Sequence, residues 1–264
     1  MNRPELFVHG VPETALTAAL VEHLPVNAAA APWNCSAEAV FWLGRGGTPA
    51  TAALPPLLRG KAHALAVIGG FVRYTETPVG SYDEVLGAVA FRQGLRPRGH
   101  VAFMAVDSET SLVGGRTNWA MPKTLASFSG DLACGTMTAT EVVGGAPKWT
   151  VGVTAHAFGF ALPLRATGTV LQQLHTDDIV AAQLRTRGRV KFALIDTSVD
   201  GDGDLPAWLR PGRHLGVLIP HLQFTLSSPA RVRVGGSAWR GITTACVGTE
   251  RLDDPRIAGS QNLR

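Results

Sequence analysis

The sequence predicts an α+β protein that is rich in β-strands, most of them antiparallel, with a few short helices. Two observations carry this prediction. First, eleven segments have the alternating or continuous apolar pattern of strands, and turn-forming residues such as Gly144–Pro147 and Ser227–Pro229 separate several of them. Second, only four segments carry helical signals. We therefore expect one large, mainly antiparallel sheet or barrel system.

The strand segments are recognised by their period-two alternation, which Lys148–Val153 shows most plainly. The predicted strands span residues 38–43, 63–74, 84–91, 100–106, 131–143, 148–157, 163–170, 189–199, 215–227, 230–235 and 239–248. No repeat, low-complexity linker or domain boundary interrupts them. The sequence thus predicts a single domain over residues 1–264, in which the polar stretch 253–264 is a loose tail.

The helical segments are short. Residues 12–23 begin with Pro12, which suits a first helical turn, and then place apolar residues at helical spacing. Residues 108–118 follow Asp107 and Ser108, either of which can cap a helix. Two further helices are predicted at 170–174 and 206–210.

The composition is that of a globular chain, and it argues against several classes of partner. Of 264 residues, 45% are hydrophobic and 17% are charged. The net charge is +4, but the arginines are scattered, so we expect no nucleic-acid partner. Because no uncharged apolar stretch reaches about 18 residues, we expect no membrane partner.

The N-terminus lacks a signal-peptide pattern, and Cys35, Cys134 and Cys246 are far apart. The sequence therefore predicts a cytoplasmic protein without a disulfide framework.

No segment of the sequence fits a known motif for binding a metal or a cofactor. An EF-hand beginning at Asp200 would need glycine and glutamate where this chain has Leu205 and Pro211, so a polar hairpin turn explains Asp200–Asp204 better. The eight histidines have no metal-ligand spacing. His156 and His221, within apolar strands, either face a pocket or are ordinary partly buried residues. The glycine pairs form no phosphate-binding loop. We expect no metal and no cofactor.

One lysine stands out by its neighbours. Lys123 follows Pro122 directly and lies among Trp119, Met121 and Phe128. An ammonium surrounded by apolar groups loses hydration, which lowers the pKa of the lysine. The sequence therefore predicts that Lys123 is an amine able to attack a carbonyl group.

A carboxylate occurs upstream in a strand of its own. Pro78 and Gly80 predict a turn, after which Tyr82 and Glu84 share one face of the following strand. By itself, Glu84 is best interpreted as a carboxylate at a strand edge. Beside a reactive lysine, the catalytic interpretation gains weight.

Together the two segments resemble the acetoacetate decarboxylase family. The family has a glycine–arginine pair followed by proline–lysine, which matches Gly115-Arg116 and Pro122-Lys123, and an upstream G-x-Y-x-E segment that matches Gly80, Tyr82 and Glu84. The resemblance extends weakly over most of the chain, but only these segments are specific. It implies a cone-shaped β-barrel, a homo-oligomer, a Schiff-base lysine at Lys123 and an active-site glutamate at Glu84.

The chain also departs from the family pattern. Decarboxylases of the family have a second lysine directly after the catalytic one, where this chain has Thr124. A second family glutamate has no counterpart in Val67–Gly70, and Glu76 lies nearby in a different position. A family arginine near the N-terminus corresponds only poorly to Arg3. The missing lysine removes one means of lowering the pKa of Lys123.

The resemblance implies a small oxo acid as the substrate. Arg116 either binds its carboxylate or forms an ion pair that fixes the helix before Lys123. Trp119, Met121 and Tyr82 line the pocket or pack in the core. We expect decarboxylation of acetoacetate or a related β-keto acid. The alternatives are another Schiff-base reaction, of the aldolase, dehydratase or cyclase type, and a ligand-binding oligomer without catalysis.

Overall fold

The strands form one sheet that closes on itself. In the computed structural model, which describes residues 3–93, 96–142, 148–174, 176 and 178–232, the strand order is β10-β8-β7-β6-β5-β4-β3-β2-β1-β9. An additional pairing between β8 and β9 joins the two sides of this order into a ring. Neighbouring strands are antiparallel except where β4 meets β5 and β7. The predicted β-rich α+β fold is confirmed.

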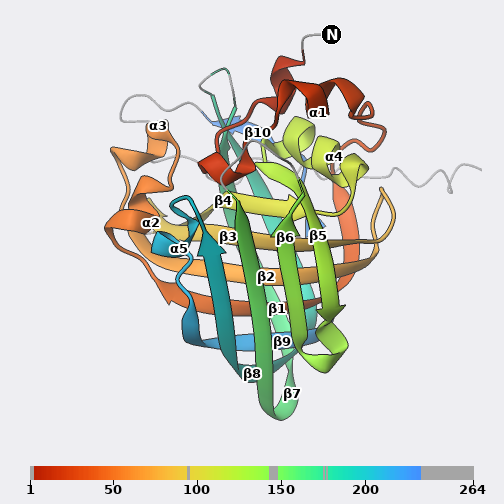
Figure 1. Cartoon of the computed structure of the whole chain (residues 1–264), viewed down its shortest axis with the longest axis vertical. Coiled ribbons are helices and arrows are strands. Elements are labelled where there is room, and N and C mark those ends of the chain that lie inside the picture. Colours follow the sequence, from red (N-terminus) through yellow and green to blue (C-terminus); the bar gives the residue numbers. More distant parts are fainter. Residues whose placement is uncertain (1–2, 94–95, 143–147, 175, 177, 233–264) are drawn as a thin grey trace, which may run out of the picture. The chain divides into compact units, whose positions relative to one another are not determined.

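Most of the strands are long, and β7 and β8 are the longest, with 25 and 23 residues. Their bounds are β1 Trp33–Arg45, β2 Ala64–Glu76, β3 Tyr82–Gln93, β4 Arg96–Val106, β5 Lys123–Asp131, β6 Thr136–Glu141, β7 Trp149–Gln173, β8 Ile179–Gly201, β9 Gly212–Leu226 and β10 Ala230–Val232. Figure 1 shows β1 to β4 and β9 running across the view, behind β5 to β8, which run from top to bottom.

The two sets of strands enclose a core of aromatic and branched side chains. Phe71 of β2 lies 6.4 Å from both Trp42 and Phe128, measured between ring centroids. The next residue, Val72, points to the opposite face of β2, since successive strand residues alternate. It belongs to a second buried cluster that includes residues of α1 and α4. The candidate site lies in this second cluster.

The helices are few and short, as predicted. Their bounds are η1 Pro4–Leu6, η2 Pro12–Thr14, α1 Ala18–His23, α2 Thr48–Ala52, α3 Pro56–Arg59, α4 Glu109–Trp119, η3 Leu132–Cys134 and α5 Leu205–Trp208. The predictions at 108–118 and 206–210 are confirmed by α4 and α5. The Ser108 hydroxyl caps α4 by accepting a hydrogen bond from the Ser111 backbone N–H. No helix among these residues is long and apolar enough to cross a membrane.

Three local predictions are wrong. Residues 170–174 are strand up to Gln173, because Val170 pairs with β8 and with β4. The helix predicted over 12–23 is broken into η2 and α1, and the Thr17 hydroxyl caps the second piece. The Asp200–Asp204 segment is not a hairpin turn. It connects β8 to α5, whose first N–H, that of Leu205, donates to the Glu13 carboxylate.

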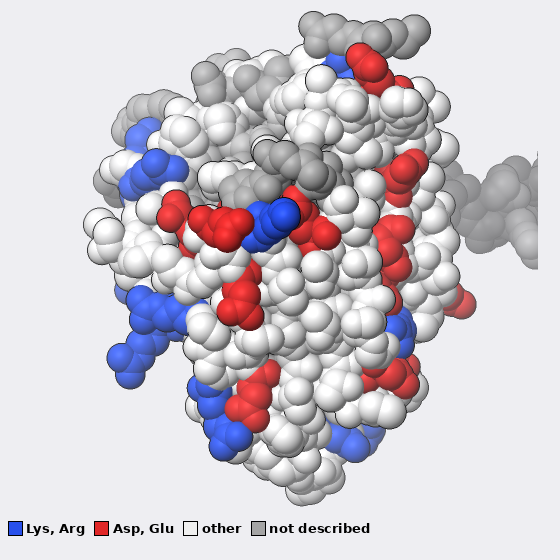
Figure 2. All heavy atoms as spheres, viewed as in Figure 1, with Lys and Arg blue, Asp and Glu red and all other residues white. Residues whose placement is uncertain are grey.

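The strand predictions mostly differ in their bounds. The segments 148–157 and 163–170 are one strand, β7, and residues 131–143 include η3 before β6 begins. The predicted turn Gly144–Pro147, the last three residues of the predicted strand 230–235, the segment 239–248 and the tail 253–264 lie outside the described residues. The face seen in Figure 2 carries acidic and basic side chains in small separate groups, with no continuous basic field on that face.

Candidate active site

Two neighbours of β4 bring Lys123 and Glu84 together. In the register, Glu84 of β3 lies opposite Val106, and Lys123 of β5 lies opposite Met104. The Lys123 Nζ atom is 2.8 Å from Glu84 Oε2. Lys123 is 3% exposed and Glu84 1%. A buried ion pair therefore forms from the two segments that the sequence analysis singled out.

Hydroxyl groups complete the surroundings of the pair. Lys123 Nζ donates to the Ser111 hydroxyl at 2.8 Å and to the Tyr82 hydroxyl at 3.4 Å. The Tyr74 hydroxyl donates to Glu84 Oε1 at 3.0 Å, and the rings of Tyr74 and Tyr82 stack at 4.3 Å. Tyr82 and Glu84 thus share the face that was predicted for them.

Two further residues of the site, Ser111 and Tyr74, were not predicted from the sequence. Ser111 lies one helical turn before Gly115 in α4, so the signal was the i, i+4 spacing from the glycine of the motif. Tyr74 is the cross-strand partner of Tyr82 in the β2–β3 pair. Cross-strand partners lie side by side on one face of a sheet. Both residues follow from the motif once the pairing is known.

Burial and the neighbouring carboxylate act in opposite directions on the pKa of Lys123. Burial lowers the pKa of Lys123, but the carboxylate of Glu84 outweighs burial, and the pKa is raised. The prediction that the pKa of Lys123 falls is therefore wrong for this state. Burial raises the pKa of Tyr82 to about 12, so its hydroxyl keeps its proton. Cys35 is buried in the same cluster, and burial raises the pKa of its thiol to about 12.

Helix α4 positions the lysine through its small residues. A Cβ atom placed on Gly115 would lie 2.7 Å from both Cδ and Cε of Lys123, so only glycine leaves room for the lysine chain there. Ala120 ends the helix in the left-handed conformation, with φ of 56°. The chain then returns toward the helix, and the Lys123 N–H donates to the Met121 carbonyl at 2.8 Å.

With the residues that the structure describes, Arg116 does not form the ion pair that was one of its two expected roles. Its guanidinium, which is buried, donates to three backbone carbonyls: Lys123 at 2.7 Å, Leu6 at 2.6 Å and Thr14 at 2.5 Å. Burial lowers its pKa to about 9. Arg116 thus ties the N-terminal segment to the backbone of Lys123, and these contacts leave little of it for a substrate carboxylate.

The other expected binding residues are engaged elsewhere or in the core. The Arg3 guanidinium donates to the carbonyls of Leu24 and Pro25 at 2.8 and 2.9 Å. The Trp119 indole N–H donates to the Ser227 carbonyl, and its ring meets Trp33 edge to face. Met121 is buried in the same cluster as Tyr82.

Some residues considered in the sequence lie away from the pair. Glu76 accepts a hydrogen bond from the Ser36 hydroxyl at an exposed position. Thr124 is buried on β5, next in sequence to Lys123, so it faces the other side of that strand. The His156 ring contacts Asp196 at 3.0 Å on the surface, and His221 lines an exposed hollow. Among the residues that the structure describes, no three metal-ligating side chains are grouped.

The acetoacetate decarboxylase family matches residues 47–203, more than half of the chain. The chain belongs to this family. The match includes both segments of the Lys123–Glu84 pair. No curated protein sequence matches the chain.

Solved structures of the acetoacetate decarboxylase family share the fold. An acetoacetate decarboxylase structure aligns with a TM-score of 0.57 at 14% identity, covering 82% of this chain and 98% of that one. The acetoacetate decarboxylase of Legionella pneumophila aligns with a TM-score of 0.54 at 16% identity, covering 83% and 97%. The enduracididine biosynthesis enzyme MppR, complexed with the condensation product of pyruvate and imidazole 4-carboxaldehyde, aligns with a TM-score of 0.54 at 16% identity, covering 79% and 92%. At these identities, the likeness establishes the fold alone.

Proposed function

We propose that this member of the acetoacetate decarboxylase family is a Schiff-base enzyme that acts on an oxo acid. Lys123 is the nucleophile, and Glu84 is its proton acceptor. The observation that carries the proposal is the 2.8 Å contact between Lys123 Nζ and Glu84 Oε2, inside a buried cluster. A general base must lie within hydrogen-bond reach of the proton that it takes, and Glu84 meets this condition.

The first steps follow from this geometry. Glu84 takes a proton from the Lys123 ammonium, which leaves a neutral amine and a carboxylic acid. The amine attacks the ketone carbon and forms a carbinolamine. Glu84 returns its proton to the departing hydroxyl, and water leaves. The result is a protonated imine beside a carboxylate, so charge is balanced at each step.

Decarboxylation of acetoacetate or a related β-keto acid is the reaction that we favour. When CO₂ leaves, the electrons of the broken C–C bond enter the protonated imine and give a neutral enamine. Protonation at carbon and hydrolysis then release the ketone and free Lys123. Because Arg3 and Arg116 are held by backbone carbonyls, neither is free to keep a product carboxylate in place. A reaction that removes the carboxylate as neutral CO₂ fits this arrangement. The imine supplies the electron sink, so no cofactor is needed.

A second candidate uses the same imine for aldol addition, dehydration or cyclisation. Two observations favour it. Thr124 stands where decarboxylases of the family have a second lysine, and the fold is shared with MppR, whose structure holds a pyruvate condensation product. The third candidate is a ligand-binding protein without catalysis, in which the raised pKa keeps Lys123 a permanent cation.

Covalent trapping separates catalysis from binding. The full-length protein is incubated with a panel of oxo acids that includes acetoacetate and pyruvate, reduced with borohydride and mapped by mass spectrometry. We expect an adduct on the Lys123 peptide, and none in Lys123→Arg, which keeps the charge but cannot form the imine. If none of the oxo acids in the panel gives an adduct on Lys123, both enzymatic proposals are contradicted.

The reaction type is then assigned by its product. CO₂ release from acetoacetate, lost in Lys123→Arg, supports the decarboxylase. An adduct with pyruvate that consumes an added aldehyde, without CO₂ release from acetoacetate, supports the aldolase-type candidate instead.

We further propose that the chain acts as a homo-oligomer in the cytoplasm and folds as a single domain over 1–264. Exposed leucines support the oligomer. Leu43, Leu215 and Leu194 are 57%, 70% and 37% exposed and pair in register across β1, β9 and β8. A contiguous apolar row of this kind is typical of a protein–protein contact. Sedimentation of the purified chain tests it: a monomer at micromolar concentration would contradict the proposal.

A further inference from the structure

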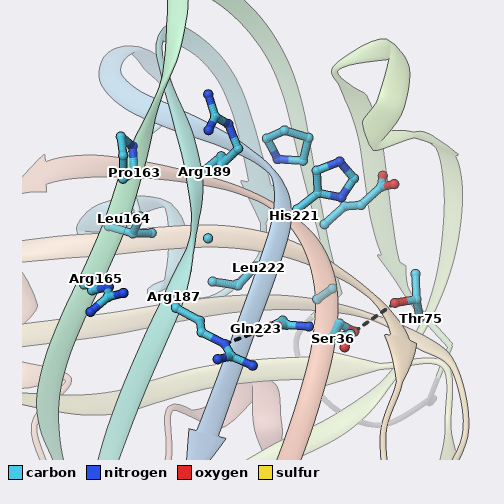
Figure 3. Close-up of a pocket in the computed structure, with 14 residues that line it drawn as sticks. Ser36, Thr75, Pro163, Leu164, Arg165, Arg187, Arg189, His221, Leu222 and Gln223 are labelled. Carbon is cyan, nitrogen blue, oxygen red and sulfur yellow. Dashed lines mark hydrogen bonds between the residues drawn. The ribbon is translucent and has the colours of Figure 1, made fainter.

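A basic hollow lies at the surface of the sheet, on five neighbouring strands. It measures about 600 Å³, and we call it the outer groove. Its principal lining residues are Ser36, Arg165, Arg187, Arg189, His221 and Gln223. Figure 3 shows Arg165 on β7, Arg187 and Arg189 on β8, and His221 and Gln223 on β9 around this space.

The outer groove is separate from the Lys123 site. Leu222, next to Gln223 in sequence, belongs to the buried cluster that contains Tyr82, and Leu164, next to Arg165, packs against that cluster from the floor of the hollow. Since successive strand residues point to opposite faces, the arginines and the Lys123 cluster lie on opposite sides of the same sheet. The arginines are therefore not explained by the proposed reaction.

The arginines of the outer groove lie side by side on neighbouring strands. Arg165 and Arg187 are direct cross-strand partners in the β7–β8 pair, and Arg189 follows two residues later on the same strand. Like charges directly opposite each other destabilise a sheet. Among the residues that the structure describes, no carboxylate lies within 4.0 Å of these three guanidinium groups, although Glu38 also lines the hollow.

Some arginines elsewhere in the same sheet are paired with carboxylates. Arg213 pairs with Asp196 at 2.7 Å, and Arg73 pairs with Asp83 at 3.0 Å. In the outer groove the hydrogen-bond partners are neutral: Arg187 donates to the Gln223 side chain at 2.8 Å, and Arg189 to the Ala161 carbonyl at 2.8 Å. These bonds orient the guanidinium groups without cancelling their charge. Each guanidinium has five N–H donors, so most donors remain open to a ligand.

We propose that the outer groove binds a small polyanion that carries two or more phosphate or carboxylate groups. Arginine suits both groups because its planar fork matches their oxygens in pairs. The bound anion offsets the repulsion between Arg165 and Arg187. The recognised chemistry is the oxyanion itself, and the test distinguishes phosphate from carboxylate.

Calorimetric titration of the full chain with pyrophosphate and with citrate, at low ionic strength, tests the proposal. We expect saturable binding of at least one probe, weakened by added salt. Arg165→Gln and Arg187→Gln should each weaken it at least about tenfold, the loss typical of one charged hydrogen-bond donor. Arg210→Gln, at an exposed position outside the outer groove, is the matched control and should bind as the wild type does.

The ligand class follows from which probe binds, and either result supports the site. Binding of neither probe, or binding that both groove variants leave unchanged, would overturn it. So would loss of binding in Lys123→Arg, which would place the anion in the Lys123 cluster. Arg187→Gln is also expected to keep or raise the melting temperature without ligand, since it relieves the repulsion. If this variant instead dissociates the oligomer, the outer groove is a subunit contact and the proposal is wrong.

Discussion

Arg116 and Lys123 are two buried cations seven residues apart, and they differ in the groups that accept their hydrogen bonds. Arg116 receives three neutral carbonyls, and burial lowers its pKa to about 9. Lys123 receives a carboxylate, which raises its pKa in spite of burial. Neutral acceptors hold a cation in place but take no proton from it. Glu84 does both, so only Lys123 has a route to the neutral amine.

The largest expected effect is at the nucleophile. Lys123→Ala removes the amine that forms the imine, and we expect turnover to fall by at least about 10³-fold. Steady-state assay of CO₂ release checks this, with circular dichroism to confirm folding. A folded variant with wild-type turnover would contradict the catalytic role of Lys123, which would then stabilise the fold as Arg116 does.

The next effect is at the proton acceptor. Glu84→Gln keeps the shape of the side chain but cannot accept the proton, and we expect kcat to fall by about 10²–10⁴-fold, the usual contribution of a general base. Glu76→Gln, an exposed carboxylate, is the control and should leave kcat unchanged. Equal kcat values in wild type and Glu84→Gln would show that the pair is only structural.

Arg116 should affect stability far more than chemistry. Arg116→Met leaves three buried carbonyls without a donor, and we expect a loss of about 3–5 kcal/mol in the free energy of unfolding. Arg116→Lys keeps a cation at this position but has fewer aligned donors, so its free energy of unfolding should fall less than that of Arg116→Met. Urea denaturation measures both. If Arg116→Met instead kept its stability and lost affinity for the oxo acid, Arg116 would be a substrate-binding residue after all.

A smaller effect is expected where helix and lysine meet. Gly115→Ala places a methyl group 2.7 Å from Lys123 Cδ and Cε, so the lysine chain must shift. We expect a loss of about 1–3 kcal/mol in the free energy of unfolding, the usual cost of overpacking, with slower adduct formation. Gly60→Ala, at a position with open space, is the control. An unchanged adduct rate would show that the lysine does not depend on this close approach.

The sequence predicted the pair but not its electrostatics. Lys123 and Glu84 were found because each lies in a short motif with a characteristic spacing. The pKa of Lys123 was predicted in the wrong direction because apolar neighbours are visible in the sequence, whereas the distance to a carboxylate 39 residues away is set by strand pairing. The strand pairing of Val170 likewise overrode the local signal for a helix at 170–174.

Long-range contacts explain the other gaps. Two carbonyl partners of Arg116 lie 110 and 102 residues away in sequence, so its role stayed open between two alternatives. Ser111 carries no motif of its own, and Tyr74 becomes visible only through its pairing with Tyr82. The fold class was within reach because alternation and turns are local, while the ring closure by β8 and β9 joins distant parts of the chain.

The most direct test compares the pH dependence of borohydride trapping in wild type and Glu84→Gln, with the adduct mapped to Lys123. In the wild type, the carboxylate holds the pKa of Lys123 above its ordinary value of 10.5. Without it, burial, the largest cause, lowers this pKa against the smaller opposing effect of Tyr82. We expect an adduct on Lys123 in both proteins, and we expect the pH of half-maximal trapping rate to be lower in Glu84→Gln by at least about one unit. No adduct on Lys123, or a shift to higher pH, would contradict it.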